Sequence, residues 1–205
     1  QRTTLAMPRV TLALATMLSF MAFTPVAAQD LQKGVDAYNA GDYATALQEW
    51  RPLAEQGNAA AQFNLGLMYY NGKGVPQDYA EAVKWWRLAA EQGDADAQSN
   101  LGLIYKNGKG VPQDYAEAVK FYRLAAAQGF ADAQNNLAVM YHLGWGVLQD
   151  NVIVHMWYNL AAANGHKKAG GWRDELAKKM SPAAIEKAQA MARECMSSGY
   201  TKCGY

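Results

Sequence analysis

Residues 101–120 read LGLIYKNGKGVPQDYAEAVK, and residues 65–84 read LGLMYYNGKGVPQDYAEAVK. The two stretches belong to consecutive 36-residue blocks, 58–93 and 94–129, which agree at 28 of 36 positions without a gap. Residues 130–165 form a third, more diverged copy, and residues 29–57 form a shorter relative that lacks the Gly-Lys-Gly insert. An internal repeat of this length is typical of proteins built by stacking one structural unit.

Each block predicts two antiparallel helices. In the second copy, small or apolar residues recur every fourth position from Ala97 to Tyr105, which is helical spacing. Gly108 can adopt the left-handed conformation that ends a helix. Asp114 is placed to cap the next helix, and Glu117, three residues later, can reach back to the cap residue. The sequence therefore predicts one helical hairpin per copy.

One hairpin cannot bury its apolar face alone, so stacked copies should share a continuous core. Gly66, Gly102 and Ala138 occupy equivalent positions, where we expect adjacent hairpins to approach closely. Residues 166–205 leave the pattern and predict two further helices, 169–180 and a second one opening at Ser181-Pro182. We expect these two helices to cap the stack.

The repeated pattern Ala-x3-Leu-Gly-x2-Tyr-x2-Gly-x-Gly-Val-x2-Asp resembles the Sel-1-like repeat, a relative of the tetratricopeptide repeat. The resemblance is strongest at 58–129, good at 130–165 and looser at 29–57. It implies an all-α, right-handed superhelical solenoid of antiparallel helix pairs whose first helices line a concave face. It also implies a non-catalytic scaffold that binds protein partners, often in a bacterial envelope.

By similarity to tetratricopeptide domains, one stripe on the first helices should face the groove. An alternative is that Phe63 and Tyr70 simply pack between repeats. Asn64, Asn100 and Asn136 recur at one position, and we expect their side chains to bond a neighbouring backbone. The candidate protein-binding residues are Phe63, Leu67, Tyr70, Ser99, Leu103, Lys106, Asn135, Val139 and His142.

The third copy departs from the pattern in its loop, where Trp145 replaces lysine and Leu148 replaces proline. Terminal repeats are commonly atypical, so we expect this extra apolar surface to meet the C-terminal cap. The alternative is an exposed surface for a partner.

The first 28 residues read as a secretory signal peptide that starts at Met7. Arg9 precedes an apolar run from Val10 to Phe23, and Val26-Ala27-Ala28 supplies a cleavage site. The run is shorter than the ~20 residues that span a bilayer. We therefore expect a periplasmic or secreted protein, monomeric and without a membrane span once the signal is removed.

The 205 residues carry a formal net charge of +1, and nucleic-acid binding would call for a strong basic excess. The two cysteines, Cys195 and Cys203, cannot build a four-cysteine zinc site. In an oxidising compartment they favour a structural disulfide that pins the tail, with two free thiols or a redox pair as alternatives.

No motif of catalysis or of metal or cofactor binding stands out. The Gly-Lys-Gly loops lack the spacing and the Ser or Thr of a P-loop, so they are interpreted as turns. His142, His155 and His166 do not pair at helical spacing with each other or with cysteine, which favours packing or surface positions. Asp78, Asp114 and Asp150 are accounted for as helix caps.

A binding module is thus the first functional hypothesis. Two others remain open. Cysteine-rich relatives have been credited with β-lactam binding or hydrolysis, although Ser-x-x-Lys is missing here. The chain could also associate with the cell wall or a polysaccharide.

Overall fold

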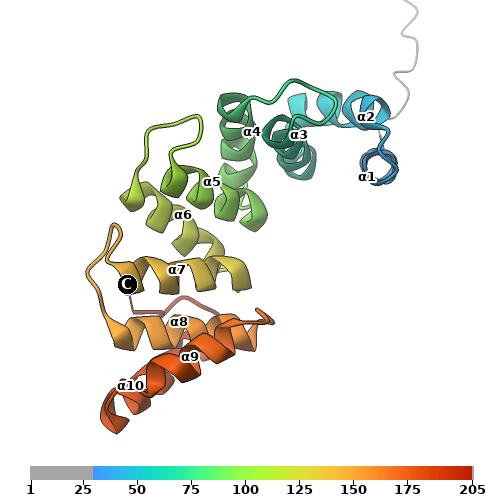
Figure 1. Ribbon diagram of the computed structural model, residues 1–205. Coiled ribbons are helices and arrows are strands. Elements are labelled where there is room, and N and C mark those ends of the chain that lie inside the picture. The colour runs from blue at the N-terminus through green and yellow to red at the C-terminus, as the bar shows by residue number, and fades with distance from the viewer. Residues whose placement is uncertain (1–29, 205) are drawn as a thin grey trace, which may run out of the picture.

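The computed structural model describes residues 30–204, so the predicted signal peptide lies outside the described residues. Within this range the chain forms ten helices and no strand. Their bounds are α1 (Leu31–Asn39), α2 (Tyr43–Glu55), α3 (Ala59–Asn71), α4 (Tyr79–Glu91), α5 (Ala95–Asn107), α6 (Tyr115–Ala126), α7 (Ala131–Leu143), α8 (Asn151–Ala163), α9 (Ala169–Ala177) and α10 (Pro182–Ser197). From α1 to α9 each helix packs on the next, and the hairpins stack into a curved array (Figure 1). The predicted all-helical solenoid is confirmed. None of these helices has the length and apolar character needed to cross a bilayer.

Helix ends follow the predicted signals. The Asp114 carboxylate accepts hydrogen bonds from the backbone N–H groups of Ala116 and Glu117 at 2.9 and 3.0 Å. Gly108 ends α5 with a φ of 66°. The predicted hydrogen bond from the Asp114 backbone N–H to Glu117, however, is wrong. Glu117 accepts from Lys120 at 3.1 Å, and the Asp114 N–H donates to the Tyr105 carbonyl at 2.9 Å, which leaves that donor already satisfied.

Gly66 and Gly102 do mark a close approach, but between the two helices of one hairpin rather than between adjacent hairpins. A Cβ added at Gly102 would lie 2.5 Å from the Tyr122 ring, and one at Gly66 would lie 2.5 Å from the Trp86 ring. The predicted position is right and the predicted partner is wrong. An aromatic ring of the second helix rests directly on the backbone of the first.

A column of buried amides joins successive hairpins. Gln62, Gln98 and Gln134 each donate to a carbonyl near the end of the preceding hairpin, at 3.0, 3.1 and 3.2 Å. Each also accepts a hydrogen bond from the side chain that ends its own hairpin, supplied by Gln92, Gln128 and Asn164 at 2.8, 2.8 and 2.9 Å. Buried polar groups are costly unless they are paired. Every junction between these hairpins therefore carries the same specific polar contact.

The Gly-Lys-Gly loops also connect repeats. Lys109 donates to the Tyr70 hydroxyl at 3.1 Å, and its ammonium lies 5.3 Å from the Tyr79 ring centroid. Lys73 lies 4.8 Å from the Tyr38 ring centroid in the equivalent place. These are cation–π distances, so each loop lysine contacts the repeat before it.

The atypical third loop follows the same geometry, which corrects the expectation that its apolar side chains meet the C-terminal cap. Trp145 stands where lysine stands in the other copies and stacks on Tyr115, with ring centroids 4.9 Å apart and planes 9° apart. Leu148 is 90% exposed. Trp145 therefore replaces a cation–π contact with ring stacking, while Leu148 contributes to the surface.

The last two helices both cover α8 (Figure 1). Cys195 at the end of α10 is bonded to Cys203, the first of the alternatives that the sequence offered, and their Cα atoms are 4.5 Å apart. The bond holds the tail so that Tyr200 lies against Gly129 and donates from its hydroxyl to Asn164 at 2.9 Å. The tail thus closes the column of amides.

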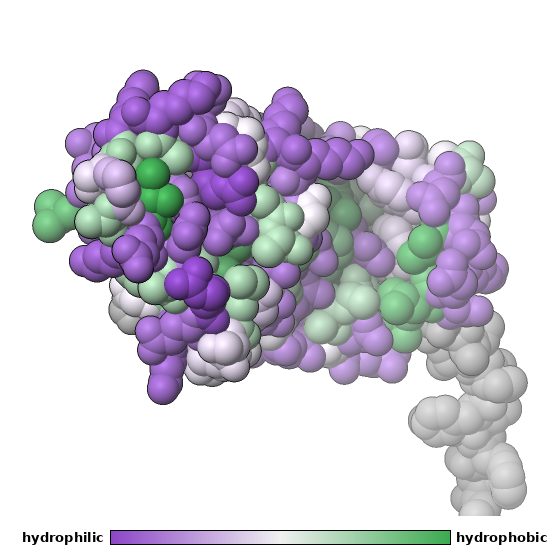
Figure 2. All heavy atoms as spheres, turned by 90° about the horizontal axis from the view of Figure 1, so that it is seen from below, coloured by the Kyte–Doolittle hydropathy of each residue, from purple (hydrophilic) through white to green (hydrophobic). Residues whose placement is uncertain are grey.

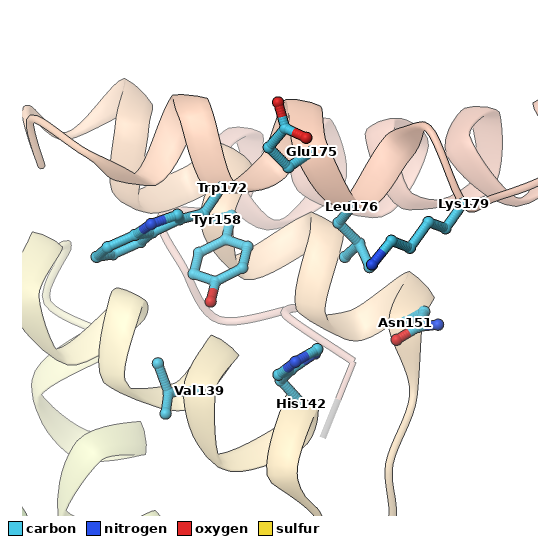
Figure 3. A pocket seen from close by; sticks show the side chains of 8 residues that line it. All are labelled: Val139, His142, Asn151, Tyr158, Trp172, Glu175, Leu176 and Lys179. Atoms are coloured by element: carbon cyan, nitrogen blue, oxygen red, sulfur yellow. The ribbon is translucent and has the colours of Figure 1, made fainter.

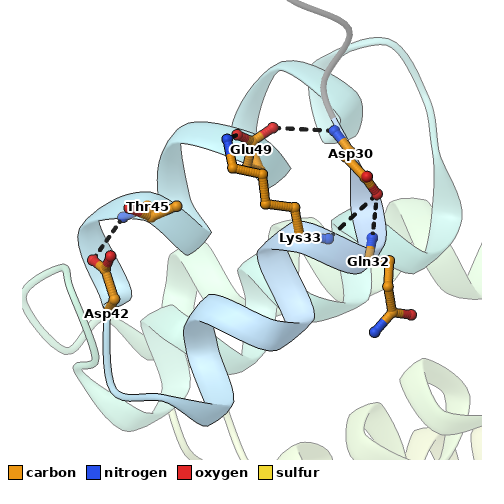
Figure 4. A network of polar contacts seen from close by, with 6 residues as sticks. All are labelled: Asp30, Gln32, Lys33, Asp42, Thr45 and Glu49. Carbon is orange, nitrogen blue, oxygen red and sulfur yellow. Dashed lines mark hydrogen bonds and ion pairs between the residues drawn. The ribbon is translucent and has the colours of Figure 1, made fainter.

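The opposite end of the stack is closed by a polar network between α1 and α2 (Figure 4). Asp30 caps α1 through the N–H of Gln32 at 2.8 Å, and its own N–H donates to Glu49 at 3.0 Å. Lys33 forms an ion pair with Glu49. The Lys33 ammonium and the Asp30 N–H lower the pKa of the buried Glu49 carboxyl. The first hairpin therefore ends in a satisfied polar contact.

Candidate functional site

The predicted stripe lies on α3, α5 and α7, and the structure divides it into exposed and buried members. His142 is exposed, and six others are partly exposed; Ser99 and Asn135 are buried and contribute little surface. The six are Phe63, Leu67, Tyr70, Leu103, Lys106 and Val139. The sequence left open whether Phe63 and Tyr70 pack between repeats or face the groove. Both side chains pack on the buried cluster beneath them and are also partly exposed to solvent.

Leu67, Tyr70 and Leu103 share a small pocket of about 110 Å³ between α3 and α5, with Trp86 of α4 contributing to its lining. Seen from below, hydrophobic side chains lie in the hollow between the two ends of the molecule and are surrounded by polar ones (Figure 2). The first helices therefore present an apolar, uneven surface of the kind that accommodates peptide side chains.

An asparagine row runs beside the apolar residues. Asn64, Asn100 and Asn136 are half-buried at equivalent positions of α3, α5 and α7. The expectation that they bond a neighbouring backbone is wrong. Within residues 30–204 none of their side-chain amides makes a hydrogen bond. Each row member thus keeps one N–H₂ donor and one C=O acceptor free on the surface.

A larger pocket of about 430 Å³ lies between α7, α8 and α9. Figure 3 shows Val139 and His142 of α7 on one side and the residues of α9 on the other, with Tyr158 between them. The ring centroids of Tyr158 and Trp172 are 5.8 Å apart. Burial raises the pKa of the Tyr158 hydroxyl. The lining residues are Val139, His142, Asn151, Tyr158, Trp172, Glu175, Leu176 and Lys179.

Sequence reasoning found only Val139 and His142 of this pocket. The sequence carried only a partial signal for the rest: Ala169 follows Ala133 by one 36-residue period, but the period alone does not show that a pocket closes there. At this spacing, α9 stands where the first helix of a fourth repeat would begin, and it is shorter than the first helices of the other repeats. Trp172 and Leu176 then fall at i and i+4 on one face of α9, and Lys179 follows in the turn after the helix ends at Ala177.

One lysine, Lys106, lies in the last turn of α5. Lys106 is half-buried, forms no ion pair with any residue from 30 to 204, and has its pKa lowered by burial. At the opposite helix end, burial and the nearby Asp94 and Asp132 raise the pKa of Asp96. The two charged edges lie about 15 Å apart along the helix axis.

The histidines occupy different environments. His155 is buried in α8, where burial and the nearby Arg173 lower its pKa, partly offset by Asp174. His166 accepts the Ala169 N–H at 3.1 Å and so helps to begin α9. Among the described residues no three His, Cys, Asp or Glu side chains gather closely enough to hold a metal ion.

This arrangement defines a class of protein, a solenoid of helical hairpins with an apolar, amide-lined surface on its first helices. Three consecutive Sel1 repeats match the family model at residues 59–94, 95–130 and 131–166, which is more than half of the chain. The chain belongs to the Sel1 repeat family. Proteins with this fold are generally scaffolds for protein–protein interaction.

Solved structures agree with the family. The chain is similar to a Sel1 repeat protein from Oxalobacter formigenes, with 30% identity and a TM-score of 0.68 over 83% of this chain and 78% of that one. It is also similar to c5321, described as a protective antigen of uropathogenic Escherichia coli with an SLR fold. There the identity is 26% and the TM-score 0.58, over 83% of this chain and 46% of that one. No curated protein matches the chain.

Proposed function

We propose that the protein is exported and holds an extended segment of a partner protein along the first helices, without catalysing a reaction. The main support is the row of Asn64, Asn100 and Asn136, whose side-chain amides make no hydrogen bond with any described residue. A side-chain amide offers one donor group and one acceptor, which matches the C=O and N–H of a peptide unit. Extended peptides bind through such main-chain contacts, while pockets beside them select side chains.

The apolar pockets support the same occupant. Leu67 and Leu103 line one pocket together with Asn100 of the asparagine row, and Val139 and Trp172 line the other. Export is supported by the signal peptide that the sequence predicts at residues 1–28. The binding surface would then meet its partner in the periplasm or outside the cell.

Site-specific photocrosslinking in intact bacteria tests this proposal. A photoreactive residue at Leu103, on the proposed surface, should capture a partner protein in the periplasmic or secreted fraction. The matched control places the same residue at Lys84 of α4, which is exposed and lines neither pocket of the first helices. Replacing the three asparagines with leucine should reduce capture at position 103 by about tenfold or more. Equal capture from position 84, or capture only in the cytoplasm, would contradict the proposal.

A further inference from the structure

The pocket between α7, α8 and α9 has room for an aromatic side chain and is lined partly by apolar residues. Its walls include Val139, Tyr158, Trp172 and Leu176, and its volume is about 430 Å³. Trp172 is 42% exposed although it is a large apolar residue. The centroid of its ring lies 5.8 Å from that of Tyr158 and 5.7 Å from that of His166. Exposed aromatic residues that are held in place by their neighbours are favoured anchors at binding surfaces.

The one acid and the one lysine that line this pocket differ in their pairing. Glu175 is held by an ion pair with Lys178 at 2.6 Å, and its carboxylate points away from the cavity (Figure 3). The Lys179 side chain reaches back beside Leu176 toward the cavity, opposite His142 and near Asn151. Lys179 forms no ion pair within residues 30–204. The acid at the pocket therefore already has a basic partner, whereas Lys179 has no carboxylate partner among the described residues.

Lys106 repeats this situation one hairpin earlier. Its ammonium is half-buried, and no carboxylate among the described residues pairs with it. The acidic residues of the same surface, Asp96 and Asp132, lie at the other end of their helices, and Asp132 is 3.9 Å from His166. The edge that carries Lys106, His142 and Lys179 thus complements negative charge.

Resting on the proposed function, we propose that this pocket recognises an acidic peptide segment by one aromatic side chain. The ring inserts between Val139, Tyr158 and Trp172. A neighbouring aspartate or glutamate of the segment pairs with Lys179, and a second acidic residue toward its other end pairs with Lys106. The pocket therefore determines which segment the asparagine row holds.

Selection from a library of random 12-residue peptides displayed on phage tests this inference with the protein from Asp30 to Tyr205. Selected peptides should carry an aromatic residue with Asp or Glu within two positions. Fluorescence anisotropy then gives the Kd of the best peptide. Trp172→Ala and Lys179→Glu should each raise this Kd about tenfold or more. Replacing the acidic residue of the peptide with lysine should restore binding to Lys179→Glu.

Lys187→Glu is the matched control. It makes the same charge change on an exposed position of α10 that does not line the pocket, and it should change the Kd less than threefold. Equal effects of the two reversals would show that net charge alone matters, and would overturn the inference. So would the absence of selected peptides, or peptides without the aromatic and acidic pair.

Failure of this inference and of the proposed function can be told apart. Suppose that the selected peptides bind more weakly when Asn64, Asn100 and Asn136 are replaced, but bind Trp172→Ala and Lys179→Glu as well as the natural chain. That result would overturn the role of the pocket and would still support the proposed function. If none of these changes alters the Kd of the peptides, both the role of the pocket and the proposed function are overturned. Circular dichroism and thermal melting of each variant confirm that it is folded.

Discussion

Gly102 shows how a single atom decides the packing of a hairpin. A Cβ at this position would lie 2.5 Å from the Tyr122 ring, so only glycine lets the ring rest on the helix backbone. The third repeat has Ala138 here, and its corresponding ring, Tyr158, contacts Trp172 and lines the large pocket. The alanine Cβ and the ring cannot both take the position seen at Gly102. One substitution between repeats is thus connected with the aromatic pocket.

Gly102→Ala should lower the free energy of unfolding by about 1–3 kcal/mol, because the added methyl group overpacks a filled space. Gly171→Ala is the control, since Gly171 lies in α9 with nothing within 4 Å of an added Cβ. There alanine should leave stability unchanged or raise it by about 0.5–1 kcal/mol through its helix propensity. Urea unfolding of the two variants measures the difference. Equal stabilities would contradict the packing described here.

The sequence located this glycine but could not name its partner. Repetition alone shows that a position is equivalent in every copy, not which helix faces it. The asparagine row failed for the same reason. Recurrence at Asn64, Asn100 and Asn136 predicted a shared environment, while only the structure shows that the three amides make no hydrogen bond within residues 30–204.

At the scale of elements, boundaries were the most predictable feature. Aspartate and asparagine caps, the glycines at helix ends and the two helices after residue 166 follow from local chemistry. The loop of the third copy was less predictable, because Trp145 was known to be apolar but its stacking partner, Tyr115, belongs to the preceding hairpin. Contacts between hairpins depend on how they stack, which a local pattern does not contain.

The C-terminal tail offers a test at this scale. Replacing Cys195 and Cys203 with serine should lower the free energy of unfolding by about 2–3 kcal/mol, because the short loop is no longer closed in the unfolded chain. It should also release Tyr200 from Asn164. Thermal melting with and without a reductant measures the effect on the natural chain. Tyr200→Phe is the control that removes only the hydrogen bond. A melting temperature that reductant leaves unchanged would contradict a stabilising role for the disulfide.

Across the whole molecule, the junctions between hairpins are interchangeable. Gln98 donates to the Ala90 carbonyl and Gln134 to the Ala126 carbonyl, in the same geometry one period apart. Stability in such arrays is approximately a sum of units and of contacts between neighbours. The solenoid was predictable from this periodicity, whereas the pocket was not. The pocket forms where the periodicity ends and α9 takes the place of a fourth first helix.

Deleting residues 94–129 should therefore leave a folded protein. The deletion removes one full period and brings Gln134 to the carbonyl of Ala90. The shortened chain should remain helical by circular dichroism and melt at a lower temperature, since one unit and one interface are lost. Deleting residues 94–123 instead breaks the period and should abolish cooperative melting. Similar melting of the two deletions would show that the junctions are not equivalent.

The column of buried glutamines has a consequence for the shape of the protein. Apolar ridges alone would let one hairpin slide past the next by a helical turn at small cost. An amide that must reach a carbonyl on one side and a second amide on the other permits a single placement. The placement of each hairpin, and with it the curvature of the array, therefore depends on a few buried atoms at each junction. A change at Gln98 should alter the shape of the proposed binding surface although Gln98 lies beneath it.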